Sequence, residues 1–101
     1  MILTGRTYSG VDGERLGLAH HLVPEGQALD GAKRWAADIE KCSPLSIRAS
    51  LEVVRDGIGK ASVQEAIETE YPGIERMRNS EDFIEGPKAF AEKRPPNWKG
   101  R

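Results

Sequence analysis

The sequence contains one cysteine, two residues each of tryptophan, tyrosine and phenylalanine, and no long apolar run. Because Cys42 has no partner, an internal disulfide is excluded, which fits the reducing cytoplasm. No stretch approaches the roughly 18 apolar residues of a membrane-spanning helix. The first ten residues, MILTGRTYSG, do not combine a charged region with a long apolar one, so they are not a signal peptide. We therefore expect a cytoplasmic protein without a membrane partner.

Neither sign of charge is in clear excess. Fifteen Lys and Arg residues face sixteen Asp and Glu residues, for a net charge of −1. Nucleic-acid-binding domains are usually strongly basic. Residues 87–101 hold five basic residues and one acidic residue, but no base-reading element accompanies them. We therefore expect no nucleic-acid partner.

Residue types that build metal or nucleophilic sites are scarce. His20 and His21 are adjacent, so on a strand they point to opposite faces and cannot both ligate one metal ion. Cys42 has no His near it in sequence and no glycine elbow around it, so we interpret it as a buried or boundary packing residue. We expect no metal site and no catalytic nucleophile.

The sequence does have apolar residues at helical spacing, and these predict an all-α fold of about four amphipathic helices. The expected helices cover residues 26–41, 44–58, 62–77 and a stretch that Asn79 or Ser80 caps and that ends before Pro95. Their expected apolar stripes are Leu29, Ala32, Ala36 and Ile39, then Ile47, Leu51, Val54 and Ile58, then Val63, Ile67, Tyr71, Ile74 and Met77, and finally Phe83, Ile84 and Phe90. Before them, Ser9 caps a short helical turn, and residues 18–23 are predicted as one short extended segment.

Local signals mark where the expected helices begin and break. Ser43 is the predicted N-cap of the second helix, with Pro44 at the first helical position, where its missing N–H costs nothing. Ser62 is the predicted N-cap of the third helix, and Glu65 completes a capping box. Pro72 is expected to kink or split that third helix.

The first residues look like a helix end without its helix. Gly5 follows Ile-Leu-Thr, as glycine does in the left-handed position after a helix. Only four residues precede it, too few for a stable helix. From this pattern we expect that the chain begins within a larger fold.

Four stretches, taken in order, resemble one family, the enoyl-CoA hydratase/isomerase (crotonase) superfamily. They are LTGRTYS, GLAHHLVP, CSPLSIRAS and NSEDFIEGPKAFAEKRPPNWKGR. The resemblance covers essentially the whole chain but only about the last third of such an enzyme. It implies that residues 1–24 are the end of the crotonase-like core and a linker, and that residues 25–101 are the C-terminal helical domain.

The resemblance implies a parent enzyme that acts on an acyl-CoA thioester, with coenzyme A as part of the substrate and no other cofactor. The family's catalytic core of strand–strand–helix turns matches nothing in this sequence, so no catalytic residue is transferred and the chain alone is expected to be inactive. The C-terminal helices would contribute to a homo-oligomer, a trimer or hexamer, and to closure over coenzyme A. Arg78 and Lys93 match positions that approach the nucleotide end of coenzyme A, although solvated surface charge is the alternative. Trp98 is expected to pack rather than to stack on adenine.

A second interpretation needs no parent enzyme. Amphipathic helices whose apolar stripes lack a core to cover also suit a stand-alone helical protein–protein interaction module. In either case the uncovered stripes predict self-association, because large apolar patches rarely remain exposed on soluble monomers.

Overall fold

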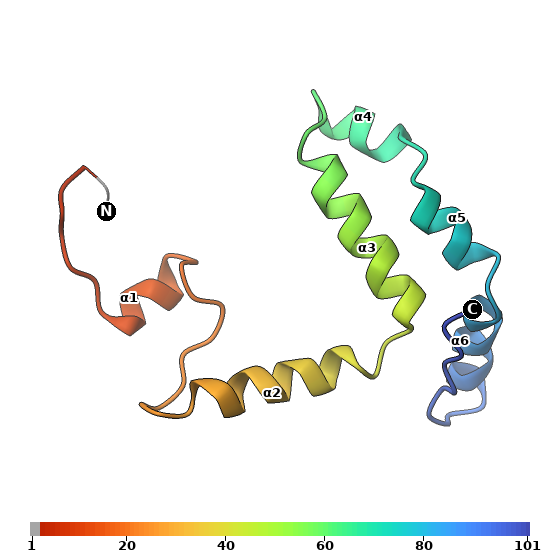
Figure 1. Ribbon diagram of the computed structural model, residues 1–101, viewed down its shortest axis with the longest axis horizontal. Coiled ribbons are helices and arrows are strands. Elements are labelled where there is room, and N and C mark those ends of the chain that lie inside the picture. Colours follow the sequence, from red (N-terminus) through yellow and green to blue (C-terminus); the bar gives the residue numbers. More distant parts are fainter. Residues whose placement is uncertain (1–2) are drawn as a thin grey trace. The chain divides into compact units, whose positions relative to one another are not determined.

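The computed structural model describes residues 3–101, and every regular element in that range is a helix (Figure 1). The helices are α1 (Gly10–Arg15), α2 (Ala28–Ile39), α3 (Pro44–Gly57), α4 (Val63–Glu68), α5 (Pro72–Arg78) and α6 (Glu81–Ala91). The predicted all-α class is confirmed. The described residues form six helices rather than about four, since the short α1 counts separately and the predicted third helix is divided into α4 and α5.

The chain divides into two compact units, one ending at Ala37 and the other spanning Asp38–Arg101. The division falls within α2. The predicted boundary after residue 24 refers to domains of a longer enzyme and stays a prediction.

Serine side chains cap four of these helices, with Ser9 at the start of α1 and three others further along the chain. Ser43 caps α3, with Pro44 in its first turn, and Ser80 caps α6 through a 3.2 Å bond from the Phe83 N–H to its hydroxyl. The Ser62 hydroxyl accepts the Glu65 N–H of α4 at 3.1 Å. The predicted N-caps Ser43 and Ser62 are confirmed, and of the two candidates Asn79 and Ser80 it is Ser80 that caps α6.

The predicted capping box of α4 is only half formed. The Glu65 carboxylate accepts the N–H of Ala61 at 2.9 Å, one residue before the cap, instead of the N–H of Ser62. A complete capping box occurs in α1, where Ser9 and Asp12 each accept the other's backbone N–H. The flexible Glu65 side chain can reach either donor, so its spacing from Ser62 does not decide which one it takes.

Pro72 splits the predicted third helix. It occupies the first turn of α5, where no intrahelical N–H is needed, and Thr69 ends α4 in an extended conformation. The Tyr71 hydroxyl spans the break and donates to the Ala66 carbonyl oxygen at 2.8 Å. The break is therefore a defined corner.

The extended segment predicted at residues 18–23 is wrong as a strand. Leu18–His20 bend and the following residues to Pro24 are irregular. The Glu14 carboxylate accepts the Leu22 N–H at 2.9 Å, and the Leu22 side chain covers Gly10, so this stretch folds back on α1 instead of pairing with a strand. Gly5 has the predicted left-handed φ of +58°, while Met1 and Ile2 of the proposed helix end lie outside the described residues.

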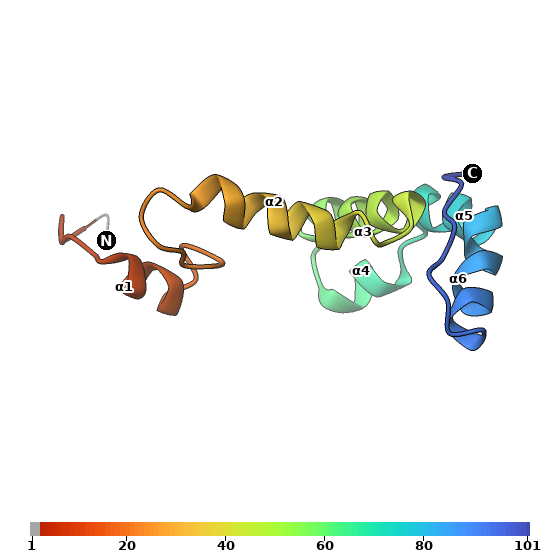
Figure 2. The same cartoon turned by 90° about the horizontal axis from the view of Figure 1, so that it is seen from below.

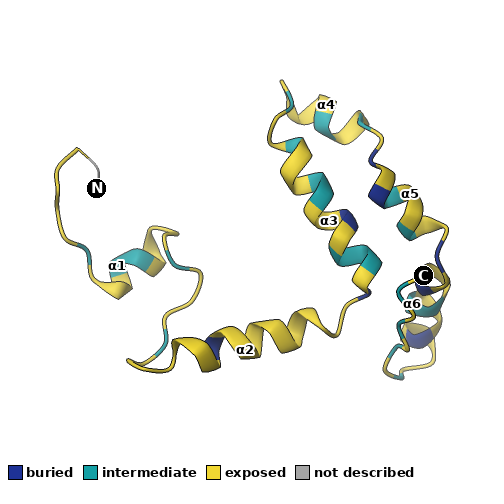
Figure 3. Cartoon of the chain, viewed as in Figure 1, coloured by how far each residue is buried: buried dark blue, intermediate teal, exposed yellow. Residues whose placement is uncertain are grey.

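Most of the predicted apolar stripes are exposed to solvent (Figure 3). The buried apolar side chains among residues 3–101 are Ala49, Tyr71 and Ala89. Phe83, Ile84 and Phe90 were predicted to form the buried face of α6, but all three are exposed, Phe90 by 88%. The reason is that α6 turns its other face, which carries Asp82 and Ala89, toward its neighbours.

The most extensive helix contact joins α3 to α5. Ala49 of α3 is 1% exposed, and a Cβ on Gly73 of α5 would lie 3.2 Å from the Ala49 Cα. Small residues on both helices therefore permit this close approach. The contact fixes the direction of α5, at whose end Arg78 lies.

Candidate functional site

The tail that follows α6 folds back beside that helix (Figure 2). Its main anchor is Asp82, which is 3% exposed. The Asp82 carboxylate accepts the N–H groups of Lys99 at 2.6 Å and Gly100 at 3.1 Å, and the hydroxyl of Ser43 at 2.9 Å. Burial opposes ionisation of Asp82, but these hydrogen bonds outweigh it and lower its pKa. One carboxylate thus joins the start of α3, the start of α6 and the tail.

A second anchor is Glu85, in the middle of α6. Its two oxygens accept the guanidinium nitrogens of Arg94 at 2.6 Å and 3.0 Å, and one of them also accepts the Asn97 N–H at 2.7 Å. The hydrogen bonds from Arg94 and Asn97 lower the pKa of Glu85 to about 2. Arg94 also donates to Glu92 at 2.6 Å, and the two carboxylates raise its pKa. The guanidinium group is held between two acids.

The third anchor is Trp98. Its indole N–H donates to the Lys41 carbonyl oxygen at 2.8 Å. The ring lies over Gly86, where a Cβ would come within 3.3 Å of it. Trp98 therefore packs between α6 and the end of α2, as expected from the sequence. We call the segment Arg94–Arg101, held by Asp82, Glu85 and the Lys41 carbonyl, the C-terminal clasp.

Lys93 lies between α6 and the clasp in an unusual backbone conformation. Its φ is +53°, the only positive φ of a non-glycine residue among residues 3–101. The Lys93 N–H donates to the Phe90 carbonyl at 3.2 Å and the Arg94 N–H to the Ala89 carbonyl at 3.1 Å, which closes the helix end as a Schellman motif. Glycine usually occupies this position, since a residue with a Cβ is less stable there by roughly 1–2 kcal/mol. The structure thus places a lysine where glycine would be less strained.

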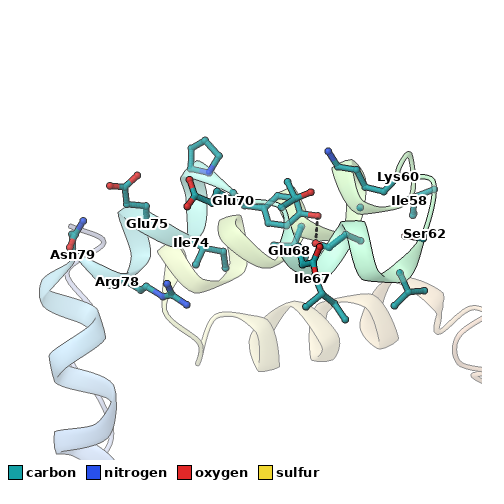
Figure 4. Close-up of a pocket in the computed structure, with 17 residues that line it drawn as sticks. Ile58, Lys60, Ser62, Ile67, Glu68, Glu70, Ile74, Glu75, Arg78 and Asn79 are labelled. Carbon is teal, nitrogen blue, oxygen red and sulfur yellow. Dashed lines mark hydrogen bonds between the residues drawn. The ribbon is translucent and has the colours of Figure 1, made fainter.

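Arg78, the last residue of α5, lines a groove formed by α3, α4 and α5. The groove has a volume of about 1370 Å³. Figure 4 shows Lys60 and Arg78 at opposite ends of it, with Ile67 and Ile74 between them. Its apolar lining residues are Val53, Ile58, Val63, Ala66, Ile67, Tyr71, Pro72 and Ile74. The groove therefore combines an apolar wall with two basic residues, Lys60 and Arg78, and three glutamates.

The structure does not place both candidate coenzyme A residues in this groove, because Lys93 is not among the residues that line it. Both side chains are exposed, and neither takes part in an ion pair within residues 3–101. Each side chain is therefore available to an anion, Arg78 at the end of α5 and Lys93 after the end of α6.

Two of the tail's anchors were missed as such by sequence reasoning. Asp82 lies in the first turn of α6, where any acidic residue is favoured by the helix dipole, so its presence there does not mark it as an anchor, and Glu85 has no sequence motif around it. A signal was present: both acids lie one turn apart on the α6 face that carries Ala89, and Arg94 follows the helix. Cys42, expected to be buried or at a boundary, is exposed.

Within the described part of the chain, no group of three or more His, Cys, Asp or Glu side chains is arranged to hold a metal ion. None of the helices found between residues 3 and 101 is long and apolar enough to cross a bilayer.

Comparison with known proteins gives one family. The family model described as enoyl-CoA hydratase/isomerase matches residues 1–101. Carnitinyl-CoA dehydratase from Proteus mirabilis is 36% identical over 105 residues, which cover 100% of this chain and 40% of that protein. Carnitinyl-CoA dehydratase from Salmonella agona is 35% identical over 107 residues, with the same coverage. The chain thus spans about 40% of the length of these curated relatives.

Solved structures of enoyl-CoA hydratases are also similar to this chain. An enoyl-CoA hydratase from Bacillus anthracis superposes with a TM-score of 0.88 at 30% identity, over 99% of this chain and 38% of that one. An enoyl-CoA hydratase from Mycobacterium tuberculosis gives a TM-score of 0.86 at 31% identity, over 98% of this chain and 39% of that one.

Proposed function

Because the chain belongs to the enoyl-CoA hydratase/isomerase family, we propose that it is the C-terminal helical part of a cytoplasmic enzyme of that family which acts on an acyl-CoA thioester. Its role is to close over coenzyme A and to contribute to a homo-oligomer, while the catalytic groups belong to a core that this sequence does not contain. One observation carries the proposal: the whole chain matches the family while spanning about 40% of its relatives, and residues 3–101 contain helices without a strand.

Arg78 and Lys93 are the residues that we propose for coenzyme A binding. The nucleotide end of coenzyme A carries phosphate groups, which a guanidinium fork or an ammonium group can pair. The strained backbone at Lys93 and the position of Arg78 at the edge of an apolar groove support this choice. The groove lining holds three glutamates against two basic residues, so the phosphates would bind at its edge and not along its length.

The exposed apolar residues support the second part of the proposal. Ile58, Val63 and Ile67 line the groove and are largely exposed, and Phe83 and Phe90 of α6 are exposed as well. Apolar surface of this extent is usually covered in a soluble protein. In the parent enzyme, the core and the neighbouring subunits of a trimer or hexamer would cover it.

Titration with coenzyme A tests the binding role. We expect Lys93→Ala and Arg78→Ala each to weaken binding by about fivefold at low salt, the effect of losing one exposed charge contact worth roughly 1 kcal/mol. The matched controls are Lys33→Ala and Arg55→Ala, which remove exposed basic residues elsewhere. Equal losses in all four variants would mean that coenzyme A senses only overall charge and would refute the site.

The alternative is a stand-alone helical module that binds another protein through its exposed apolar faces. The same exposed residues favour it. The titration separates the two, since such a module has no reason to bind coenzyme A through Arg78 and Lys93.

A further inference from the structure

Glu85 lies within α6, whereas Arg94 follows the end of that helix by three residues. On a helix continued through Lys93, residues 85 and 94 would lie about 13 Å apart along the axis and on opposite faces. They could not then form a bidentate pair. The distances of 2.6 Å and 3.0 Å between the Glu85 oxygens and the Arg94 nitrogens therefore require the chain to reverse between them.

The reversal occurs at Lys93, whose φ is +53°. The lysine Cβ crowds the following carbonyl in this conformation, so neighbouring contacts must hold it. Before Lys93, α6 supplies the Phe90 carbonyl as acceptor for its N–H. After it, the Glu85 carboxylate holds both the Arg94 guanidinium and the Asn97 N–H. Glu85 thus holds the residues that follow the turn against α6.

We propose that Glu85 is a positioning residue that keeps Lys93 in its left-handed conformation and so sets the direction of its ammonium group; this inference rests on the coenzyme A contact proposed above. Glu85 itself does not contact coenzyme A. Without the charge of Glu85 its two hydrogen bonds with Arg94 are lost, and Lys93 can relax to a negative φ. The lysine side chain then leaves the position from which it pairs with a phosphate.

Nuclear magnetic resonance of the full chain tests the structural step. In the unsubstituted 101-residue chain, Lys93 is expected to show the strong intraresidue amide-to-Hα Overhauser effect of a positive φ. The Asn97 amide is expected to exchange slowly. In Glu85→Gln we expect the Overhauser effect to weaken and the Asn97 amide to exchange at least about tenfold faster. Glu40→Gln, an exposed glutamate without an ion pair among the described residues, is the matched control. Because the Asn97 N–H donates to Glu85 itself, its exchange reports only the loss of that bond. A Glu85→Gln variant that keeps the Lys93 Overhauser effect therefore overturns the proposal, whatever the exchange rate of Asn97.

A rescue variant separates positioning from a general loss of structure. Glycine adopts the left-handed conformation without steric cost. In Glu85→Gln the Lys99 and Gly100 amides, whose acceptor Asp82 is unchanged, are expected to exchange faster because the turn that leads to them opens. Adding Lys93→Gly is expected to slow their exchange again. A double variant that exchanges as fast as Glu85→Gln alone would show that Glu85 does not act through the Lys93 turn.

Titration with coenzyme A completes the test. Glu85→Gln is expected to bind about fivefold more weakly, as Lys93→Ala does, although it removes a negative charge. The double variant should fold like the unsubstituted chain and still bind coenzyme A weakly. Glu40→Gln should bind coenzyme A like the unsubstituted chain. If Lys93→Ala binds coenzyme A more weakly but Glu85→Gln binds it as tightly as the unsubstituted chain, the positioning role is overturned. If Lys93→Ala binds like the parent, the coenzyme A contact is wrong, and the resonance data still decide whether Glu85 holds Lys93.

Discussion

At the scale of single residues, Asp82 is the one acidic or basic side chain that is buried among residues 3–101. Its partners are all neutral, namely the Ser43 hydroxyl and the N–H groups of Lys99 and Gly100. Its place in the first turn of α6 adds the favourable end of the helix dipole. A charge without a cation is therefore stabilised by oriented dipoles, and in return it holds three segments together.

Removing this carboxylate should be costly. Asp82→Ala leaves the buried Ser43 hydroxyl and the part-buried N–H groups of Lys99 and Gly100 without their acceptor. A buried polar group that loses its partner costs about 1–3 kcal/mol, and a part-buried group costs less because water can reach it. We expect a loss of roughly 2–3 kcal/mol in the free energy of unfolding, measured by urea denaturation. Asp56→Ala, at an exposed position of α3, should change it by less than about 0.5 kcal/mol. Equal effects would contradict the anchoring role.

Acid should open the C-terminal clasp. The pKa of Glu85 falls from 4.5 to about 2 on folding, and that of Asp82 is lowered as well. Depressed carboxyl pKa values contribute stability that is present above the unfolded pKa and is lost as the pH falls through the folded value. The urea midpoint should therefore decrease from pH 4.5 toward pH 2, the window set by Glu85. Glu85→Gln should flatten this decrease and Glu40→Gln should not; a parent midpoint independent of pH across the window would be inconsistent with both shifts.

At the scale of elements, the contact between α3 and α5 depends on residues without bulk. The backbone of Gly73 lies against Ala49, and Tyr71 closes the corner between α4 and α5. Little apolar surface is buried there, so the packing geometry at these few positions matters more than the total area.

Enlarging Ala49 tests this close approach. Ala49→Leu must push α5 away from α3, and overpacking of this kind typically costs about 1–3 kcal/mol. The expected result is a lower melting temperature by circular dichroism. The same substitution at Ala37, which is exposed in α2, is the control and should have little effect. A melting temperature of Ala49→Leu equal to that of Ala37→Leu would show that the two helices do not pack tightly.

At the scale of the whole molecule, each unit leaves large apolar side chains in contact with water. Ile58 is 81% exposed, and Val63, Ile67 and Phe90 are nearly as exposed or more so. Helices with amphipathic patterns but little mutual burial are suited to contacts with other surfaces.

We therefore predict that the 101-residue chain self-associates. Light scattering coupled to size exclusion should report a dimer or a larger species, with an average mass that rises with concentration. Ile58→Lys combined with Ile67→Lys should shift the mass toward the monomer, because both side chains line the exposed groove. The control is Lys33→Gln, which changes charge without touching the groove. A sharp monomer at high concentration would contradict the prediction.

We also predict that the purified chain does not hydrate a short enoyl-CoA. Such catalysis requires an oxyanion hole, whose donors are typically worth about 2.7–4 kcal/mol each, and an acid and base within hydrogen-bond reach of the substrate carbons. Glu65 and Glu68 are exposed on α4 and have no such arrangement. The check is the absorbance of the conjugated thioester over time. Turnover above the uncatalysed rate that is lost on changing one residue of this chain would show that it is a complete enzyme.

The sequence by itself determined the features that act within about one helical turn. Ser43, Ser62 and Ser80 cap their helices because hydroxyl and N–H lie three residues apart, and Pro72 breaks a helix because it has no N–H. The order of the short motifs was enough to recognise the family. The roles of Arg78 and Lys93 came from that resemblance and stay predictions.

Only the tertiary structure decided which faces meet. Asp82 binds Lys99 seventeen residues later, and Trp98 donates to a carbonyl fifty-seven residues earlier. No local propensity encodes such pairs, because they form only once the chain has reversed at Lys93. The same holds for burial: apolar spacing marked the stripe of Phe83, Ile84 and Phe90, but the polar anchors on the opposite face of α6 turned that stripe toward solvent. Periodicity tells which residues share a helix face, and the fold alone tells what that face contacts.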